Sequence, residues 1–229
     1  MAESMLKRVA DKLRGKFVVL DGPDGSGKTT QLSRLTADLR EAGLDVVGAK
    51  DPGGTEIGER IRALLLGPQL ERMAPRCEAL LFMASRAQLV AEVVEPAIAA
   101  GRTVLCDRFI SATFAYQGAA GVKLDEIRGL GQAAVCQTWP DVTVILDLPA
   151  DTGLSRAKRS ASAGVTSTTC DQVVADAMEC RPLAFHRRVR EIFQRLPELY
   201  PKRVTVIDAS GTVDEVYQRL LEALERADY

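Results

Sequence analysis

The feature that most constrains the fold of this chain is a glycine-rich segment, Gly22-Pro-Asp-Gly-Ser-Gly-Lys-Thr29. It matches the pattern G-x-x-x-x-G-K-[ST] at every fixed position. It also follows an apolar run and opens a helical pattern. Glycines let backbone N–H groups surround phosphate oxygens, and a helix N-terminus adds a favourable dipole. A glycine-rich turn that merely caps a helix is the weaker alternative. The segment therefore predicts binding of a nucleoside triphosphate with Mg²⁺.

Two side chains of this loop have specific predicted tasks. Lys28 should bridge the β- and γ-phosphates, and the hydroxyl of Thr29 should face Mg²⁺. The residues that we predict to contact the nucleotide run continuously along the loop: Gly22, Pro23, Asp24, Gly25, Ser26, Gly27, Lys28, Thr29 and Thr30.

The rest of the chain alternates strand and helix patterns. Short apolar runs predict five strands, at residues 16–21, 44–49, 103–106, 142–148 and 203–209. Apolar residues at helical spacing predict helices at 28–42, 55–66, 75–100, 111–117, 124–136 and 212–227. Pro96 should bend or interrupt the longest of them. Strands that alternate with helices indicate an α/β fold, with a five-stranded parallel sheet and helices on both faces.

The chain contains no repeat and no linker rich in glycine or proline, so we expect a single domain over residues 1–229. Residues 1–15 lack the apolar stretch of a signal peptide and predict a short, solvated amphipathic helix that extends the domain. We expect a lid at about residues 151–181, because the stretch from Ser160 to Thr169 is small and polar and lies next to a basic segment. A plain surface loop is the alternative.

Composition argues against several classes of protein. The 30 Lys and Arg residues nearly balance the 31 Asp and Glu residues, which argues against non-specific nucleic-acid binding. No apolar run approaches the length of a membrane span. The five cysteines lack C-x-x-C spacing and there is one histidine, so we expect reduced thiols in a cytoplasmic protein and no zinc site.

Four further segments carry a resemblance to the bacterial thymidylate kinases, a family of P-loop nucleoside monophosphate kinases. In order, residues 51–62, 80–86, 107–118 and 176–190 resemble the family segments R-E-P-G-G-T…G-E…I-R, L-L-F-x-A-x-R, D-R-Y-x-x-S-x-x-A-Y-Q-G and D-R-x-E…F-H-x-R-V-R. With the glycine-rich loop they cover the chain from about Lys16 to Ser210. The resemblance implies a kinase that converts ATP and dTMP to ADP and dTDP with Mg²⁺, and a homodimer.

Spacing and resemblance together suggest how the acceptor base is held. Phe82 and Arg86 lie four residues apart, so they share one helix face. A ring can stack on a pyrimidine and a guanidinium can donate to its carbonyl oxygen, which suits thymine. Without the resemblance Phe82 would be interpreted as a core residue. The resemblance also places Thr113 and Gln117 near the base.

The resemblance assigns charged residues to the acceptor sugar, the phosphates and the metal. Asp24 matches the carboxylate that holds the sugar 3′-hydroxyl, and Lys50 stands where the family has a substrate-binding arginine. Arg108 can grip the acceptor phosphate with two hydrogen bonds, although a salt bridge at a strand end is the alternative. Asp107 and Glu179 match acids near the metal. The predicted metal ligands are therefore Thr29, Asp107 and Glu179.

Three departures from the family pattern concern charge or hydroxyl groups. Lys50-Asp51 replaces R-E, Phe109 replaces a tyrosine, and Ala177 replaces an arginine of the lid. The loop between Gly22 and Gly27 also contains no arginine, so the lid must supply positive charge to the transferred phosphoryl group. The candidates are Arg156, Lys158, Arg159 and, in addition, Arg181. A solvated basic helix face is the alternative.

The predicted catalytic residues are Lys28, Asp107, Arg108, Arg156 and Arg159. Two other functions stay open at this point. The chain could phosphorylate another nucleoside monophosphate, such as dUMP, dGMP or a modified pyrimidine nucleotide. It could also bind nucleotides with little turnover, because Ala177 replaces the expected arginine.

Overall fold

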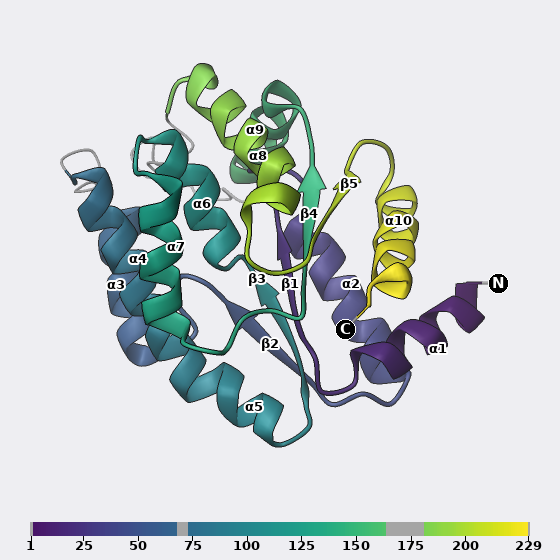
Figure 1. The fold of residues 1–229 in the computed structure, drawn as a ribbon. Helices are drawn as coiled ribbons and strands as arrows, with labels where there is room; N and C mark the ends of the chain where they lie inside the picture. The colour runs from purple at the N-terminus through teal and green to yellow at the C-terminus, as the bar shows by residue number, and fades with distance from the viewer. Residues whose placement is uncertain (1, 68–72, 164–180, 229) are drawn as a thin grey trace.

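One parallel sheet forms the centre of the molecule. The computed structural model describes residues 2–67, 73–163 and 181–228. Within them five parallel strands lie in the order β2-β3-β1-β4-β5 (Figure 1). The strands are β1 (Phe17–Asp21), β2 (Val46–Lys50), β3 (Thr103–Asp107), β4 (Val142–Asp147) and β5 (Val204–Asp208). Every strand lies within two residues of its predicted bounds, and the predicted α/β fold is confirmed.

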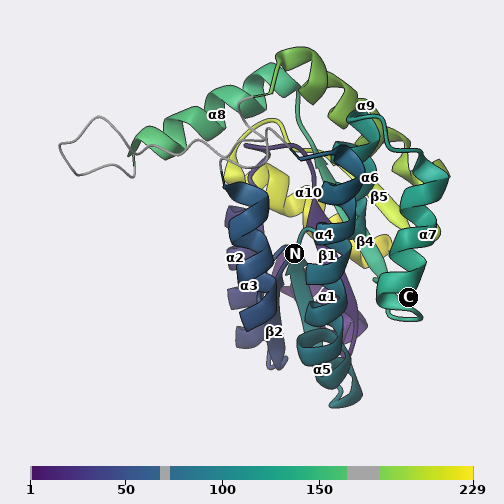
Figure 2. The same cartoon turned by 90° about the vertical axis from the view of Figure 1, so that its left-hand side faces the viewer.

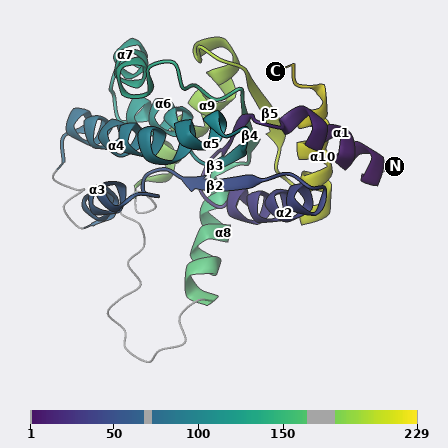
Figure 3. The ribbon, with the colours of Figure 1, turned by 90° about the horizontal axis from the view of Figure 1, so that it is seen from below.

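Helices cover both faces of this sheet, as Figure 3 shows from below. One face carries α1 (Ala2–Leu13), α2 (Lys28–Glu41) and α10 (Val213–Arg226). The other carries α4 (Pro75–Leu89), α5 (Glu95–Ala99), α6 (Ile110–Ala119), α7 (Leu124–Val135) and α9 (Leu183–Leu199). Helix α3 (Glu56–Leu66) packs beside α4. The described residues contain no helix with the length and hydrophobicity that a membrane span requires.

The order of the strands reverses between β1 and β3. From β1 the chain continues through α2 to β2 on one side, whereas from β3 it crosses to β4 on the other side. Ligands of open α/β sheets bind outside the carboxyl ends of the strands at such a point. Leu20 pairs with Asp107, so β1 and β3 end within one residue of each other. The residues that follow them, Gly22 and Arg108, therefore lie beside each other at the reversal.

The helix predicted over residues 75–100 is divided. Helix α4 ends at Leu89, a π-helical turn follows at Val90–Val94, and α5 begins at Glu95. Pro96 lacks the N–H group that a continuous helix needs, and its ring crowds the carbonyl of the preceding turn. A wider turn accommodates both effects. The prediction that Pro96 interrupts this helix is confirmed.

The N-terminal helix α1 is amphipathic as predicted, but the prediction that it is only solvated is wrong. Val9 and Leu13 are fully buried in the core that α1 shares with α10. Arg8 forms an ion pair with Glu225, and the hydroxyl of Thr103 donates to the Leu13 carbonyl at 2.7 Å. The apolar face of α1 is buried because α10 offers an apolar face of its own beside it.

Helix α8 (Ala150–Ala163) begins at the predicted lid and projects away from the body of the molecule (Figure 2). The stretch predicted as a flap, Ser160 to Thr169, therefore begins inside a helix, because α8 continues to Ala163. The remainder of that stretch, with Ala177 and the predicted metal ligand Glu179, lies outside the described residues.

Candidate active site

The glycine-rich loop joins β1 to the first turn of α2 and presents backbone donors. Gly27 precedes α2 with φ 92°, a left-handed conformation that glycine adopts readily. No side chain among the described residues caps the first N–H groups of α2. A helix start of this kind leaves N–H groups and a positive dipole end for an anion. The predicted phosphate-binding residues thus form a loop at the carboxyl end of β1 and the first turn of α2 that follows it.

The ammonium group of Lys28 points back into this loop. It donates to the carbonyl oxygens of Gly22 at 2.9 Å and Pro23 at 2.8 Å. Burial, together with the nearby Arg108 guanidinium, lowers the pKa of Lys28 to about 8. An anion in the loop would favour the charged form of Lys28. It would also compete with the two carbonyl oxygens for the N–H groups of the Lys28 ammonium.

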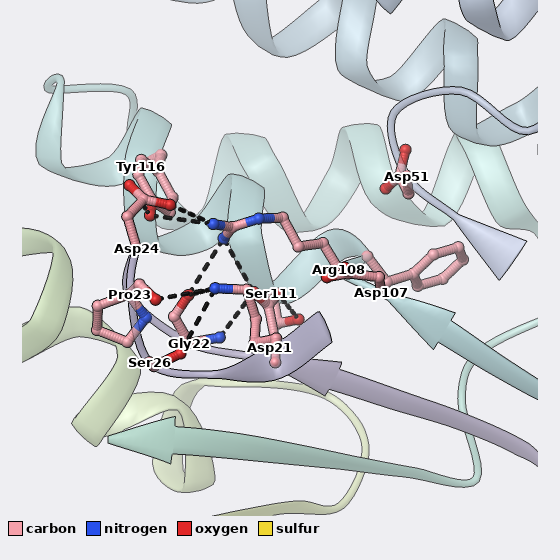
Figure 4. A network of polar contacts seen from close by, with 12 residues as sticks. Asp21, Gly22, Pro23, Asp24, Ser26, Asp51, Asp107, Arg108, Ser111 and Tyr116 are labelled. Carbon is pink, nitrogen blue, oxygen red and sulfur yellow. Dashed lines mark hydrogen bonds and ion pairs between the residues drawn. The ribbon is translucent and has the colours of Figure 1, made fainter. Parts of the chain in front are cut away.

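Arg108 connects the end of β3 to the glycine-rich loop (Figure 4). Its Nη1 lies 3.2 Å from both Asp21 Oδ1 and the Gly22 carbonyl oxygen, and its Nη2 donates to Asp24 Oδ1. The Tyr116 hydroxyl donates to the second oxygen of Asp24 at 2.7 Å. Arg108 has φ 67°, a left-handed conformation that costs a non-glycine residue about 1–3 kcal/mol. The network of ion pairs and hydrogen bonds offsets this cost and fixes the guanidinium beside the loop.

The pKa values of the two aspartates in this network, Asp21 and Asp24, are shifted in opposite directions. Burial opposes the charged form of Asp24, but Arg108, Lys28 and the Tyr116 hydroxyl outweigh it and hold the pKa of Asp24 below its usual range. Burial raises the pKa of Asp21, against the opposing effects of Arg108 and Ser111. Asp24 therefore keeps its charge and can accept a hydrogen bond from a substrate hydroxyl.

A cavity of about 350 Å³ opens beside the loop. Its size lies in the range of small-molecule sites in proteins, which is about 300–1,000 Å³. All residues that we predicted to bind the acceptor line it: Asp24, Lys50, Phe82, Arg86, Arg108, Thr113 and Gln117. The structure thus brings together side chains from the loop, β2, α4, β3 and α6, at the point where the strand order reverses.

Arg86 lines this cavity and is held in place by a buried ion pair. Its Nε donates to Asp51 Oδ2 at 2.7 Å, and each of the two side chains is 1% exposed. Its Nη2 donates to the Phe109 carbonyl at 3.0 Å and to Thr113 Oγ1 at 3.3 Å. Among the described residues, Nη1 contacts the Met83 sulfur at 3.0 Å, which is a weak acceptor. Nη1 is therefore the nitrogen with donor capacity left for a ligand.

Thr29 and Asp107, two of the predicted metal ligands, lie together. The Thr29 hydroxyl donates to Asp107 Oδ2 at 3.3 Å. A hydroxyl and a carboxylate are oxygen ligands of the kind that Mg²⁺ prefers, and substrate phosphates commonly complete its coordination. Within the described residues no three His, Cys, Asp or Glu side chains form a metal-binding group. The pair therefore fits a metal that binds together with phosphates.

The predicted catalytic residues Arg156 and Arg159 do not line the cavity. Both lie on α8, where Arg156 is half-buried and Arg159 is exposed. The first turn of α8 is packed directly on the loop: a Cβ atom added at Gly153 would lie 2.3 Å from the Asp24 carbonyl oxygen, and one at Gly25 would lie 2.0 Å from the Gly153 carbonyl oxygen. Both positions need glycine because the two backbones touch.

Sequence reasoning missed several residues of the site. Asp51, Arg62 and Tyr116 line the cavity, and Arg62 Nη1 donates to the Pro52 carbonyl at 2.7 Å. The Asp51–Pro52 peptide bond is cis. All of these residues lie inside the segments that carry the family resemblance, which was the available signal. Their partners could not be identified, because those partners come from other elements.

The fold and this site define a class: an α/β protein with a P-loop at the carboxyl end of its central strand and a cavity directly beside that loop. A family model described as thymidylate kinase matches residues 20–220. The chain belongs to the thymidylate kinase family, and the predicted family is confirmed.

Individual thymidylate kinases match this chain over nearly their whole length. The chain is 43% identical over 212 residues to a thymidylate kinase of Desulfosudis oleivorans, covering 92% of this chain and 96% of the relative. It is 44% identical over 211 residues to a thymidylate kinase of Rhizorhabdus wittichii, covering 92% and 97%. A thymidylate kinase of an Exiguobacterium species is 41% identical over 219 residues, covering 93% and 98%.

Proposed function

We propose that the protein transfers the γ-phosphoryl group of ATP to dTMP and releases ADP and dTDP. The observation that carries this proposal is one cavity beside the P-loop, lined by every predicted acceptor-binding residue. Membership of the thymidylate kinase family supports it. The relatives do not favour the two alternatives left open by the sequence, another acceptor nucleotide or a binding protein with little turnover.

In this proposal each part of the site binds one part of the substrates. Lys28 and the N–H groups of the loop bind the β- and γ-phosphates of ATP, and Arg108 binds the acceptor phosphate. Asp24 accepts a hydrogen bond from the sugar hydroxyl. Phe82 stacks on the base, and Arg86 donates to its carbonyl oxygen. Catalysis is then largely positioning and charge neutralisation, without a covalent intermediate.

Thr29 and Asp107 would hold Mg²⁺ beside these phosphates. The predicted third ligand, Glu179, lies outside the described residues. When bound, Mg²⁺ supplies positive charge that neutralises the phosphate oxygens during transfer.

We also propose that the lid at about residues 151–181 supplies charge in the transition state. The loop contains no arginine, and Arg156 and Arg159 lie on the helix that begins on it. Replacing both by alanine should lower kcat far more than it raises either KM, because this charge acts mainly in the transition state. A normal kcat in steady-state kinetics of the double variant would mean that the segment is only a solvated helix face.

For assembly and location we propose a homodimer in the cytoplasm. Ile57 and Leu64 on α3 and Leu80 on α4 are about half exposed, and these helices pack side by side. Exposed apolar side chains on neighbouring helices suit an interface between copies. The free thiols of Cys77, Cys106 and Cys136 suit a reducing compartment. Analytical ultracentrifugation tests the dimer, and a monomer would contradict it.

A panel of acceptors tests the proposed reaction. The purified protein is assayed with ATP, Mg²⁺ and each of dTMP, dUMP, dCMP and dGMP, and kcat/KM is measured for each acceptor. The proposal requires the highest kcat/KM with dTMP. A higher value with any of the other three nucleotides, or no turnover with any acceptor, would contradict it.

A further inference from the structure

Two polar contacts link α4 to α6 across the acceptor cavity. Glu78, Phe82 and Arg86 recur every four residues on α4 and share one face. Arg86 contacts Thr113 on α6 at 3.3 Å, and Glu78 Oε1 accepts from Gln117 Nε2 at 2.7 Å. Phe82 lies between these two contacts in sequence, and both Phe82 and Gln117 line the cavity. The contacts therefore bracket the position at which a base would stack.

The contact with Glu78 determines which end of the Gln117 amide faces the cavity. A carboxylate can only accept hydrogen bonds, so it must face the NH₂ group of the amide. Arg181 Nη2 donates to the other oxygen of Glu78 at 3.2 Å, so each carboxyl oxygen of Glu78 faces a hydrogen-bond donor. Glu78 and Gln117 are both fully or almost fully buried, so water does not compete freely for either group. With the nitrogen committed to Glu78, Gln117 presents its carbonyl oxygen to the ligand.

The cavity thus offers two groups of opposite kind to a base edge. Gln117 offers an acceptor, and Nη1 of Arg86 offers a donor. A pyrimidine with an N3–H group and an O4 carbonyl, such as thymine or uracil, complements both. Cytosine has an unprotonated N3 and an amino group at C4, so it would place acceptor against acceptor and donor against donor. Unpaired buried polar groups are costly, and they allow a site to reject the wrong ligand.

We propose that Glu78 is a positioning residue that makes the site selective for 4-oxo pyrimidines over 4-amino pyrimidines. It acts through Gln117 and does not touch the base. This proposal rests on the proposed function, because it assumes that the base of the acceptor nucleotide occupies this cavity.

The variant Glu78→Gln tests the proposal with almost no change in shape. A glutamine at position 78 can donate its NH₂ group to the Gln117 oxygen, so the Gln117 amide can turn its own NH₂ group toward the base. The ratio of the Kd for dCMP to the Kd for dTMP, measured by calorimetry, should fall by about 10- to 100-fold. The ratio of kcat/KM for dTMP to kcat/KM for dCMP should also fall, and the KM for ATP should stay as in the wild type.

The matched control is Glu126→Gln. Glu126 on α7 pairs with Arg76, two residues before Glu78 on α4, and it does not line the cavity. This control removes an α4 ion pair by the same chemical change and should leave the ratio unchanged. A Glu78→Gln variant that weakens dTMP and dCMP equally would overturn the proposal, because Glu78 would then only stabilise the fold.

A second variant covers the case in which Glu78→Gln does not fold. The exchange Glu78→Gln with Gln117→Glu keeps one amide and one carboxylate in the pair and turns a carboxylate oxygen toward the base. It should retain a preference for dTMP over dCMP, and a loss of that preference would contradict the proposal. A wild type that does not phosphorylate dTMP would instead refute the proposed function. A wild type that prefers dTMP, with an unchanged ratio in Glu78→Gln, would refute only the role of Glu78.

Discussion

Removing Arg86 should destabilise the protein as well as weaken binding of dTMP, because its partner Asp51 would remain buried without a counter-ion. Both side chains are 1% exposed, and Asp51 Oδ1 has no hydrogen-bond partner among the described residues. Removing one partner of a buried ion pair costs about 3–5 kcal/mol. For a chain of this size each kcal/mol lowers Tm by about 2–4 °C, so Arg86→Ala should lower Tm by about 6–20 °C.

The same variant should have a distinctive pH dependence. Burial raises the pKa of Asp51, and Arg86 opposes this effect, so Arg86→Ala should raise that pKa further. The folded variant then binds a proton more tightly than the unfolded chain does. Its stability is greatest when Asp51 is protonated, and it falls as the pH rises from the unfolded pKa of about 4 toward the folded pKa. The Tm difference between the wild type and the variant should therefore shrink as the pH is lowered from about 7 to about 5.

Thermal unfolding at both pH values measures this difference, and Arg86→Ala with Asp51→Asn is the control. The double variant has no buried charge at position 51, so it should be more stable than Arg86→Ala at neutral pH and should lose the added pH dependence. A double variant no more stable than Arg86→Ala, with a Tm difference independent of pH, would refute the reasoning. Arg86 would then stabilise the folded protein through packing alone.

Three other changes give further tests. Lys28→Ala should lower phosphoryl transfer by orders of magnitude, and near-normal turnover in a folded variant would remove Lys28 from the mechanism. In the wild type, kcat/KM for ATP should fall as the pH rises above about 8, because the free Lys28, with a pKa of about 8, loses its charge there; a flat profile would contradict this. Gly153→Ala should lower both Tm and kcat, since the new Cβ would lie 2.3 Å from the Asp24 carbonyl oxygen. The control Gly129→Ala lies in α7 with no atom within 4 Å of the new Cβ, and it should raise stability by about 0.5–1 kcal/mol.

The fold could be predicted because its signals are local. Each strand is a short apolar run between polar or glycine residues, and Pro96 marks the interruption of a helix by its own chemistry. The packing of α1 could not be predicted in this way. An amphipathic pattern shows that a helix has an apolar face, but not whether another element covers it. Val9 and Leu13 are buried because α10, more than 200 residues away in sequence, packs beside them.

The acceptor cavity could be predicted in part, for a similar reason. Motifs at the ends of β1 and β3 gather because parallel strands end at one edge of the sheet. The residues that hold the binding groups in place were missed. Asp51 is 35 residues from Arg86, and Glu78 is 39 residues from Gln117. A carboxylate can be recognised in a sequence, but its partner across two helices depends on how those helices pack.

The sequence predicted the same catalytic role for Arg156 and Arg159 on α8, but the structure places these two residues differently. The close contact of Gly25 with Gly153 fixes the first turn of α8 on the P-loop. Along a helix, Arg156 lies about 4.5 Å beyond Gly153 and Arg159 about 9 Å beyond it. A rotation of α8 about this contact would move Arg159 about twice as far as Arg156. Arg156 is half-buried near the fixed end, whereas Arg159 is exposed farther out. Of the two arginines, Arg156 is therefore the one whose position depends less on the orientation of α8. In the proposed lid, Arg159 would contribute charge only in those orientations that bring α8 over the loop.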